Sequence, residues 1–232
     1  MEYPHNRPYT ADDLVRIITL LRDPVNGCPW DKVQTHTSIR MNFLEEAYEA
    51  VDALDLDDPV LMCEELGDVL MQVAFHTCME QETGRFTWEQ VCDGVCQKLI
   101  ERHPNIFGTQ PGYEGITDWD ALKNKEKGRR TLADDLESVP RAMPALMRAA
   151  KLQKRAARHG AALQGADAAA LADAAENLQT AQPASAQAEQ AVGELLFAAA
   201  NLARQAGVDP EQALQKANEA FCTAAGPVGL KR

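Results

Sequence analysis

Four carboxylate side chains occur as two pairs with the same spacing on neighbouring segments. Glu46 and Glu49 form the first pair, and Glu65 and Asp68 form the second. Residues three apart lie on one face of an α-helix, about one turn from each other. If two antiparallel helices carry the pairs, four like charges meet, and protons or a cation must hold them together. Hard oxygen ligands of this kind favour Mg²⁺, with Mn²⁺ as the alternative.

The segments that carry these pairs are predicted to be consecutive helices joined by a tight turn. The first covers 37–55 and the second covers 59–82. Asp58 supplies an N-cap and Pro59 suits the first helical position, so we expect the second helix to fold back along the first. The predicted buried face of the first helix, with Glu46 at its edge, consists of Phe43, Leu44, Ala47, Val51 and Leu54.

The second helix is apolar on almost all sides, which is typical of a helix in a protein core. One polar stripe interrupts this surface, and it consists of Glu65, Asp68, Gln72 and His76. Burying the two carboxylates without a partner would cost several kcal/mol each. No basic residue lies between Arg40 and Arg85 to form a local ion pair. The pattern therefore favours a metal site, and salt bridges between helices remain the alternative.

The overall charge restricts the class of partner. The chain has 232 residues and a net charge of −12, which argues against binding to a nucleic-acid backbone or an anionic membrane. A nucleotide is compatible, because a cation could bridge an acidic site and the phosphates. No apolar run approaches the ~20 residues of a membrane span, and the N-terminus has no apolar signal core. The six cysteines include no CxxC pair, so we expect neither zinc nor disulfides, and we expect a cytoplasmic protein.

The chain divides into three predicted parts. No segment has the pattern of a strand, so the predicted fold class is all-α. Residues 1–107 form an N-terminal helical domain that contains the carboxylate pairs. Residues 108–140 are rich in Gly, Pro and charge, and they form a connector with one short helix near Trp119. Residues 141–232 form an Ala-rich helical domain.

The second helical domain resembles the first. The segment EELGDVLMQVAFH at 64–76 aligns with QAVGELLFAAANL at 190–202, and WEQV at 88–91 aligns with PEQA at 210–213. The positions of Glu46, Glu49, Glu65 and Asp68 are occupied in the second copy by Asn177, Thr180, Ala191 and Glu194. We therefore expect tandem helical-bundle repeats in which the N-terminal copy carries the chemistry and the C-terminal copy is degenerate.

Taken together, these motifs resemble the all-α nucleoside triphosphate pyrophosphohydrolases, and in particular their MazG group. The resemblance rests on the ExxE and ExxD pairs with fifteen residues between them, GCPWDKVQTHTSIR at 27–40, KLIERHPNIFG at 98–108 and ALMRAAKLQKRAA at 145–157. It implies Mg²⁺-dependent hydrolysis of ribo- or deoxyribonucleoside triphosphates to the monophosphate and pyrophosphate, in a helical bundle assembled as a dimer. Some two-domain members do their chemistry in the C-terminal copy, which is degenerate here.

The implied chemistry suggests roles for further side chains. The four paired carboxylates are the expected metal ligands. Glu45, next to them, is a candidate to orient or deprotonate the attacking water, with a solvated helix glutamate as the alternative. Lys98 and Arg102 are four residues apart and are candidates to hold the leaving phosphates. A surface pair with Glu101 or a contact with the helix dipole is the alternative for them.

A loop before the first carboxylate helix carries candidate substrate contacts. Trp30 follows Cys-Pro in this loop and is a candidate to stack on a nucleobase. Asp31, Gln34 and His36 follow closely and are candidates to read the polar edge of the base. A Trp after Gly and Pro is also a common loop anchor into a core, and this alternative remains open.

Two other functions and one assembly follow from the same pattern. The fold would also suit a base-specific dUTP or dCTP hydrolase, or an enzyme acting on phosphoribosyl-ATP. A non-catalytic helical interaction protein is the second alternative, although the intact carboxylates of the N-terminal copy argue against it. One small helical segment cannot cover a helix that is apolar nearly all round, so we expect a homodimer whose interface includes residues 59–82.

Overall fold

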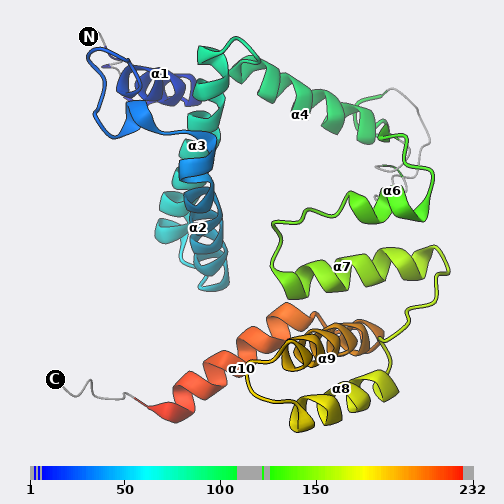
Figure 1. Ribbon diagram of the computed structural model, residues 1–232. Coiled ribbons are helices and arrows are strands. Elements are labelled where there is room, and N and C mark those ends of the chain that lie inside the picture. The colour runs from blue at the N-terminus through cyan, green and yellow to red at the C-terminus, as the bar shows by residue number, and fades with distance from the viewer. Residues whose placement is uncertain (1–2, 4, 6, 109–121, 123–125, 227–232) are drawn as a thin grey trace. The chain divides into compact units, whose positions relative to one another are not determined.

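The structure is a computed structural model, and it describes residues 3, 5, 7–108, 122 and 126–226 (Figure 1). In these residues every regular element is a helix and no strand occurs, which confirms the predicted all-α class. The chain forms two compact units, Met1–Ile116 and Thr117–Arg232. The short helix expected near Trp119 lies outside the described residues. No helix in the described part is long and apolar enough to cross a membrane.

The first unit is built around a long central helix, α3. Its helices are α1 (Ala11–Leu21), the 3₁₀ turn η1 (Asp31–Val33), α2 (His36–Asp55), α3 (Pro59–Glu82) and α4 (Trp88–Arg102). The helices α1, α2 and α4 each pack against α3. The Asp58 side chain accepts hydrogen bonds from the backbone N–H groups of Val60 and Leu61, and Pro59 follows at the first position. The predicted cap therefore forms, and α3 folds back along α2 (Figure 1).

The face of α2 that packs on α3 differs from the predicted one. The buried residues are Ile39, Ala50 and Ala53, whereas Val51 and Leu54 are 50% and 52% exposed. The prediction that Val51 and Leu54 are buried was therefore wrong. Small Ala side chains at the contact let two helix backbones approach closely, and this contact rotates the larger apolar side chains outward.

The burial of α3 is uneven along its length. The C-terminal half is covered, and its buried residues are Gln72, Ala74, Phe75, Thr77, Cys78, Met79 and Glu80. The N-terminal half is open: Val60 is 77% exposed, Leu66 is 50% exposed and Leu70 is 39% exposed. Within one chain α3 is thus a core helix only in its C-terminal half, where Val15 and Ile18 of α1 and Trp88 of α4 complete the core.

The second unit is a helical bundle with a core of small side chains. Its helices are α6 (Leu132–Glu137), α7 (Ala145–Arg158), α8 (Ala168–Thr180), α9 (Ala186–Gln205) and α10 (Pro210–Ala225). The helices α8 and α9 lie side by side, α7 packs on α9, and α6 packs on α7. Most of its buried apolar residues are alanines, which include Ala156, Ala166, Ala174, Ala191, Ala198 and Ala200. Such residues permit close helix packing.

Candidate functional site

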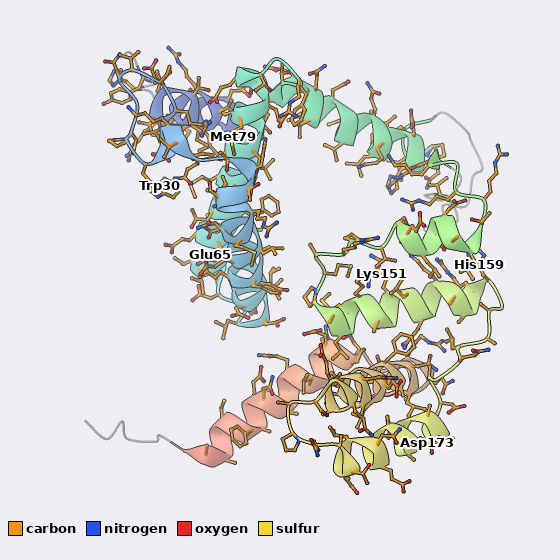
Figure 2. The ribbon with its side chains drawn as sticks, in the orientation of Figure 1. Trp30, Glu65, Met79, Lys151, His159 and Asp173 are labelled. Carbon is orange, nitrogen blue, oxygen red and sulfur yellow. The ribbon has the colours of Figure 1, made fainter. Side chains whose placement is uncertain are left out.

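The helices α2 and α3 bring three of the predicted carboxylates together. One oxygen each of Glu46, Glu49 and Glu65 lies within 4.8 Å of the other two. Glu65 lies on α3 within the α2–α3 pair (Figure 2). Asp68 is outside this group of three, but its charge acts on both Glu46 and Glu65. In the described residues this is the single group of three or more metal-ligating side chains at such distances.

The carboxylates disfavour one another's ionisation. Burial raises the pKa of Glu46, a hydrogen bond from Gln72 lowers it, and the charges of Asp68 and Glu49 raise it further. Burial is also the main cause that raises the pKa of Glu65, followed by neighbouring acidic side chains. The ionised cluster therefore lacks compensating charge. A hard divalent cation with a preference for carboxylate oxygens fits this set of ligands.

Ordinary salt bridges do not compensate these charges. Among the described residues, the ion pairs of the first unit join Arg22 to Glu82, and His36 and Arg85 to Glu80. None of these pairs includes a member of the carboxylate cluster. The described side chains therefore do not form the alternative, a structural salt-bridge network between α2 and α3.

Gln72 connects the buried part of α3 to the carboxylates. Its Nε2 donates a hydrogen bond of 3.3 Å to Oε1 of Glu46. The side chain is 7% exposed, and its Oε1 is buried without a hydrogen-bond partner in the described part of the chain. Gln72 lies two turns after Glu65 on the same polar stripe, so it orients a carboxylate of the neighbouring helix. We therefore identify it as a positioning residue for Glu46.

Arg22 holds the loop before α2 against α3, and sequence reasoning missed this residue. Its Nε and Nη2 donate to the two carboxylate oxygens of Glu82 at 2.6 and 2.8 Å. Its Nη1 donates to the backbone oxygens of Asp31 at 2.8 Å and Gln34 at 3.2 Å. The guanidinium also lies over the ring of Phe75, 5.3 Å from its centroid. No local pattern could reveal a partner sixty residues away along the chain.

Trp30 lies on the surface of this loop (Figure 2). It is 57% exposed, and its ring meets Phe75 edge-on with centroids 6.5 Å apart. Gln34 Nε2 donates to the backbone oxygen of Trp30 at 2.9 Å, and the Ser38 hydroxyl donates to Gln34 Oε1 at 2.7 Å. The amide of Gln34 thus shapes the loop. Most of the indole surface is available to a ligand, which differs from an anchor buried in the core.

His36 ties the other end of the loop to α3. Its Nε2 contacts Oε1 of Glu80 at 2.5 Å, and its Nδ1 lies 2.7 Å from Nδ1 of His76. Glu80 is buried and also pairs with Arg85 at 2.7 Å. Burial lowers the pKa of His76, and the charge of His36 lowers it further. Both ring nitrogens of His36 have protein partners, so its contacts are those of a residue that positions the loop.

Three further predicted site residues, Glu45, Lys98 and Arg102, are not part of the group of three carboxylates. Glu45 is exposed on α2, next to Glu46 in the chain. Lys98 is exposed and Arg102 is half-buried in the last turns of α4. The C-terminal end of α4 points away from α2 and α3 (Figure 1). Within one chain, therefore, the structure does not bring Lys98 and Arg102 to the carboxylates.

The corresponding positions of the second unit lack the ligands. Asn177 and Thr180 lie on α8, and Ala191 lies on α9, where it is 2% exposed. Glu194 is the one carboxylate at these four positions, and Gln190 donates a hydrogen bond of 2.8 Å to it. A neutral methyl group at Ala191 suits a dry helix contact, whereas Glu65 at the matching position faces other carboxylates.

Comparisons with known proteins assign the family. Residues 34–107 match the MazG nucleotide pyrophosphohydrolase domain, a range that contains both carboxylate pairs. The nucleoside triphosphate pyrophosphohydrolase of Escherichia coli (strain K12) is 41% identical over 219 residues, which cover 90% of this chain and 83% of that protein. The nucleoside triphosphate pyrophosphohydrolase/pyrophosphatase MazG of Thermotoga maritima is 39% identical over 212 residues, with 90% and 82% covered. The chain therefore belongs to the MazG nucleotide pyrophosphohydrolase family.

Proposed function

We propose that this protein hydrolyses ribo- and deoxyribonucleoside triphosphates to the monophosphate and pyrophosphate. The observation that carries the proposal is the cluster of Glu46, Glu49 and Glu65 between α2 and α3, inside the family-matched range. The relatives described above are nucleoside triphosphate pyrophosphohydrolases. Together, the cluster and the relatives favour this reaction over a non-catalytic interaction role. In a protein that binds no cation, crowded carboxylates would only repel one another.

Four carboxylates are the proposed ligands of Mg²⁺. Glu46, Glu49 and Glu65 are already close, and Asp68 lies one turn further along α3. When bound, Mg²⁺ supplies positive charge against the phosphate oxygens and acidifies water. Glu45 is exposed next to the cluster and is the proposed acceptor of the proton from the attacking water. Gln72 holds Glu46 in place through the 3.3 Å hydrogen bond.

The loop before α2 is the proposed base-binding element. Trp30 offers an indole face that is 57% exposed, and an aromatic face of this kind stacks on any base. Asp31 and Gln34 lie beside it in a loop that Arg22 holds through two backbone oxygens. A stacking contact tolerates every base, so it supports broad base use. The base-specific alternatives, dUTP, dCTP or phosphoribosyl-ATP, require additional polar contacts.

We also propose that the protein acts as a homodimer of tandem repeats. Each unit contains an adjacent helix pair, α2–α3 or α8–α9, followed by a further helix. Apolar side chains on the outer faces of α2 and α3 are exposed in one chain, and they are Tyr48, Val51, Leu54, Val60, Leu66 and Leu70. A second copy packed on this surface would cover it. The same packing could supply phosphate-binding side chains that one chain does not place at its own cluster.

A substrate screen with matched variants tests the reaction. The full-length protein is incubated with each of the eight common ribo- and deoxyribonucleoside triphosphates and Mg²⁺, and pyrophosphate and orthophosphate are measured separately. We expect pyrophosphate as the product. Asp68→Asn should remove turnover, whereas Glu194→Gln, at the matching position of the second unit, should not. Release of orthophosphate, or equal loss in both variants, would contradict the proposal.

A further inference from the structure

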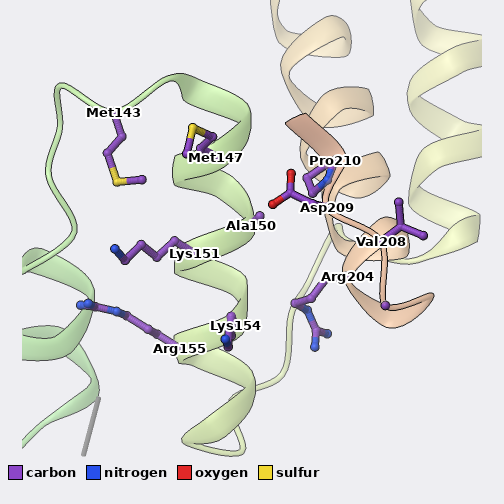
Figure 3. Close-up of a pocket in the computed structure, with 11 residues that line it drawn as sticks. Met143, Met147, Ala150, Lys151, Lys154, Arg155, Arg204, Val208, Asp209 and Pro210 are labelled. Atoms are coloured by element: carbon purple, nitrogen blue, oxygen red, sulfur yellow. The ribbon is translucent and has the colours of Figure 1, made fainter. Parts of the chain in front are cut away.

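The second unit contains a cationic pocket that the proposed reaction does not use. It has a volume of about 730 Å³ and lies between α7 and the connection from α9 to α10 (Figure 3). Lys151 and Lys154 line it from α7, and Arg204 lines it from the last turn of α9. The lining contrasts with the net charge of −12 of the whole chain.

In the part of the chain that the structure describes, the positive side chains of Lys151, Lys154 and Arg204 form no ion pairs. Lys151 and Lys154 are three residues apart and lie on one face of α7. Among the described residues, no ion pair includes either lysine or Arg204, and Asp135 instead pairs with Arg155, Arg158 and His159. Arg204 donates through Nε to Asn201 at 2.9 Å, which fixes the direction of its side chain.

Two other charged residues of the pocket have structural roles. Arg155 is 7% exposed and pairs with the buried carboxylate of Asp135 at 2.9 Å, so it holds α6 on α7. Asp209 caps α10, because its Oδ1 accepts the backbone N–H groups of Glu211 at 2.9 Å and Gln212 at 3.1 Å. Three cations therefore remain for a ligand, against the single carboxylate of Asp209 in the lining.

The size and the apolar wall of the pocket indicate more than a phosphate group. Pockets of about 300–1,000 Å³ hold whole small molecules, so a single phosphate would fill a fraction of this one. Met143 and Met147 line it on the α7 side (Figure 3), and thioethers adapt to planar rings and contact them favourably. We propose that this pocket binds a nucleotide, with its phosphate at the cationic lining and its base against Met143 and Met147.

The proposed site is independent of the carboxylate cluster and of its metal. A phosphate held by ammonium and guanidinium groups needs no divalent cation. Binding should therefore persist in EDTA and in an Asp68→Asn variant. Adenosine monophosphate is a suitable probe because it contains no phosphoanhydride bond to hydrolyse. A failure of this proposal thus leaves the proposed hydrolysis untouched, and the reverse also holds.

Isothermal titration calorimetry on the full chain tests the proposal. Adenosine monophosphate is titrated into Asp68→Asn protein in EDTA at low salt, and we expect one site per chain. The added change Lys151→Gln/Lys154→Gln should weaken binding by about tenfold or more, because two charged hydrogen-bond donors are lost. Lys216→Gln, an exposed lysine on α10 outside the pocket, is the matched control and should leave the affinity unchanged.

Two ligand controls separate the parts of the proposed contact. Adenosine, which lacks the phosphate, should bind much more weakly than adenosine monophosphate. Added salt should lower the affinity for adenosine monophosphate, because it screens the charges. Pyrophosphate has no base to contact Met143 and Met147. Met147→Ala should therefore lower the affinity for adenosine monophosphate but not the affinity for pyrophosphate. No heat at millimolar ligand, unchanged affinity in the double-lysine variant, or equal loss for both ligands in Met147→Ala would overturn the nucleotide assignment. Because both lysines are exposed, circular dichroism should show unaltered folding.

Discussion

The rings of His36 and His76 are stacked at an interplanar angle of 6°, with their Nδ1 atoms 2.7 Å apart. Two N–H groups cannot face each other at this distance, so one of the two nitrogens must act as the acceptor. The other nitrogen of His36 contacts the buried Glu80. Since His36 begins α2 directly after the loop and His76 lies in α3, this contact ties the loop to α3.

The pair predicts a loss of stability at mildly acidic pH. The pKa of His76 is lowered from its ordinary value of 6.5, mainly by burial and then by the charge of His36. The stabilising contribution of neutral His76 is therefore fully present above pH 6.5 and lost as the pH falls through the lower, folded-state pKa. His76→Gln should remove this part of the pH dependence. Urea midpoints from pH 8 to 5 measure it, and parallel curves for both proteins would contradict the assignment.

The carboxylate cluster predicts the opposite dependence of folding stability on pH. The pKa of Glu65 is raised above its ordinary 4.5 by burial and neighbouring acids, so its contribution is favourable below pH 4.5 and lost as the pH rises through the folded-state value. Glu65→Gln should abolish turnover yet raise the metal-free melting temperature at pH 7. The difference in melting temperature between the variant and the wild type should disappear below pH 4.5. Mg²⁺ at 100 times its Kd should stabilise the wild type by about 2.7 kcal/mol. An early-melting variant would indicate a structural role instead.

Arg22 predicts a change in loop order. Replacing it with Gln removes the bidentate contact to Glu82 and the Nη1 hydrogen bonds to the backbone oxygens of Asp31 and Gln34. The Asp31 oxygen keeps the hydrogen bond from the Gln34 backbone N–H. We expect about 1–3 kcal/mol of lost stability. Hydrogen exchange should accelerate in residues 28–38, and KM should rise more than kcat falls. Arg16→Gln, an exposed arginine on α1, is the control. Unchanged hydrogen exchange in the loop would contradict the role of Arg22 in holding it.

Trp30 predicts a separation of binding from stability. Because its indole is 57% exposed, Trp30→Ala should leave the melting temperature nearly unchanged. Loss of base stacking costs about 1–3 kcal/mol, so KM should rise by roughly tenfold or more for every base. Trp30→Phe should retain most of the affinity. A large loss of stability with unchanged KM would identify Trp30 as an anchor of the loop rather than a substrate contact.

The exposed apolar surface of α2 and α3 predicts a homodimer. Light scattering should give about twice the 25.4 kDa chain mass at micromolar concentration. Leu66→Glu, at a position 50% exposed in one chain, should shift the protein toward monomer without unfolding it. A charge at Val192, exposed on α9 of the other unit, is the control. A fully active wild-type monomer would rule out the dimer.

Local signals in the sequence were sufficient to predict the helices that form the site. The cap at Asp58 and the Pro after it predicted the start of α3. The ExxE and ExxD spacings predicted a carboxylate cluster, of which Glu46, Glu49 and Glu65 come together. The inner face of α2 was harder to predict, because hydrophobicity ranks Val51 above Ala50 while close helix packing selects the smaller side chain. Contacts between distant segments, such as Arg22 with Glu82, depend on the fold and leave no periodic trace.

The alanines between α2 and α3 also affect which size of metal ion the carboxylate cluster could accept. Ala50 and Ala53 are 6% and 0% exposed on the helix that packs against α3, so the size of the side chains at these positions limits how near the two helix axes can approach. Mg²⁺ needs oxygens at about 2.0–2.1 Å, whereas Ca²⁺ accepts about 2.3–2.6 Å. A larger residue at Ala53 would act as a spacer, and it would widen the coordination cage toward the larger ion without altering a single ligand.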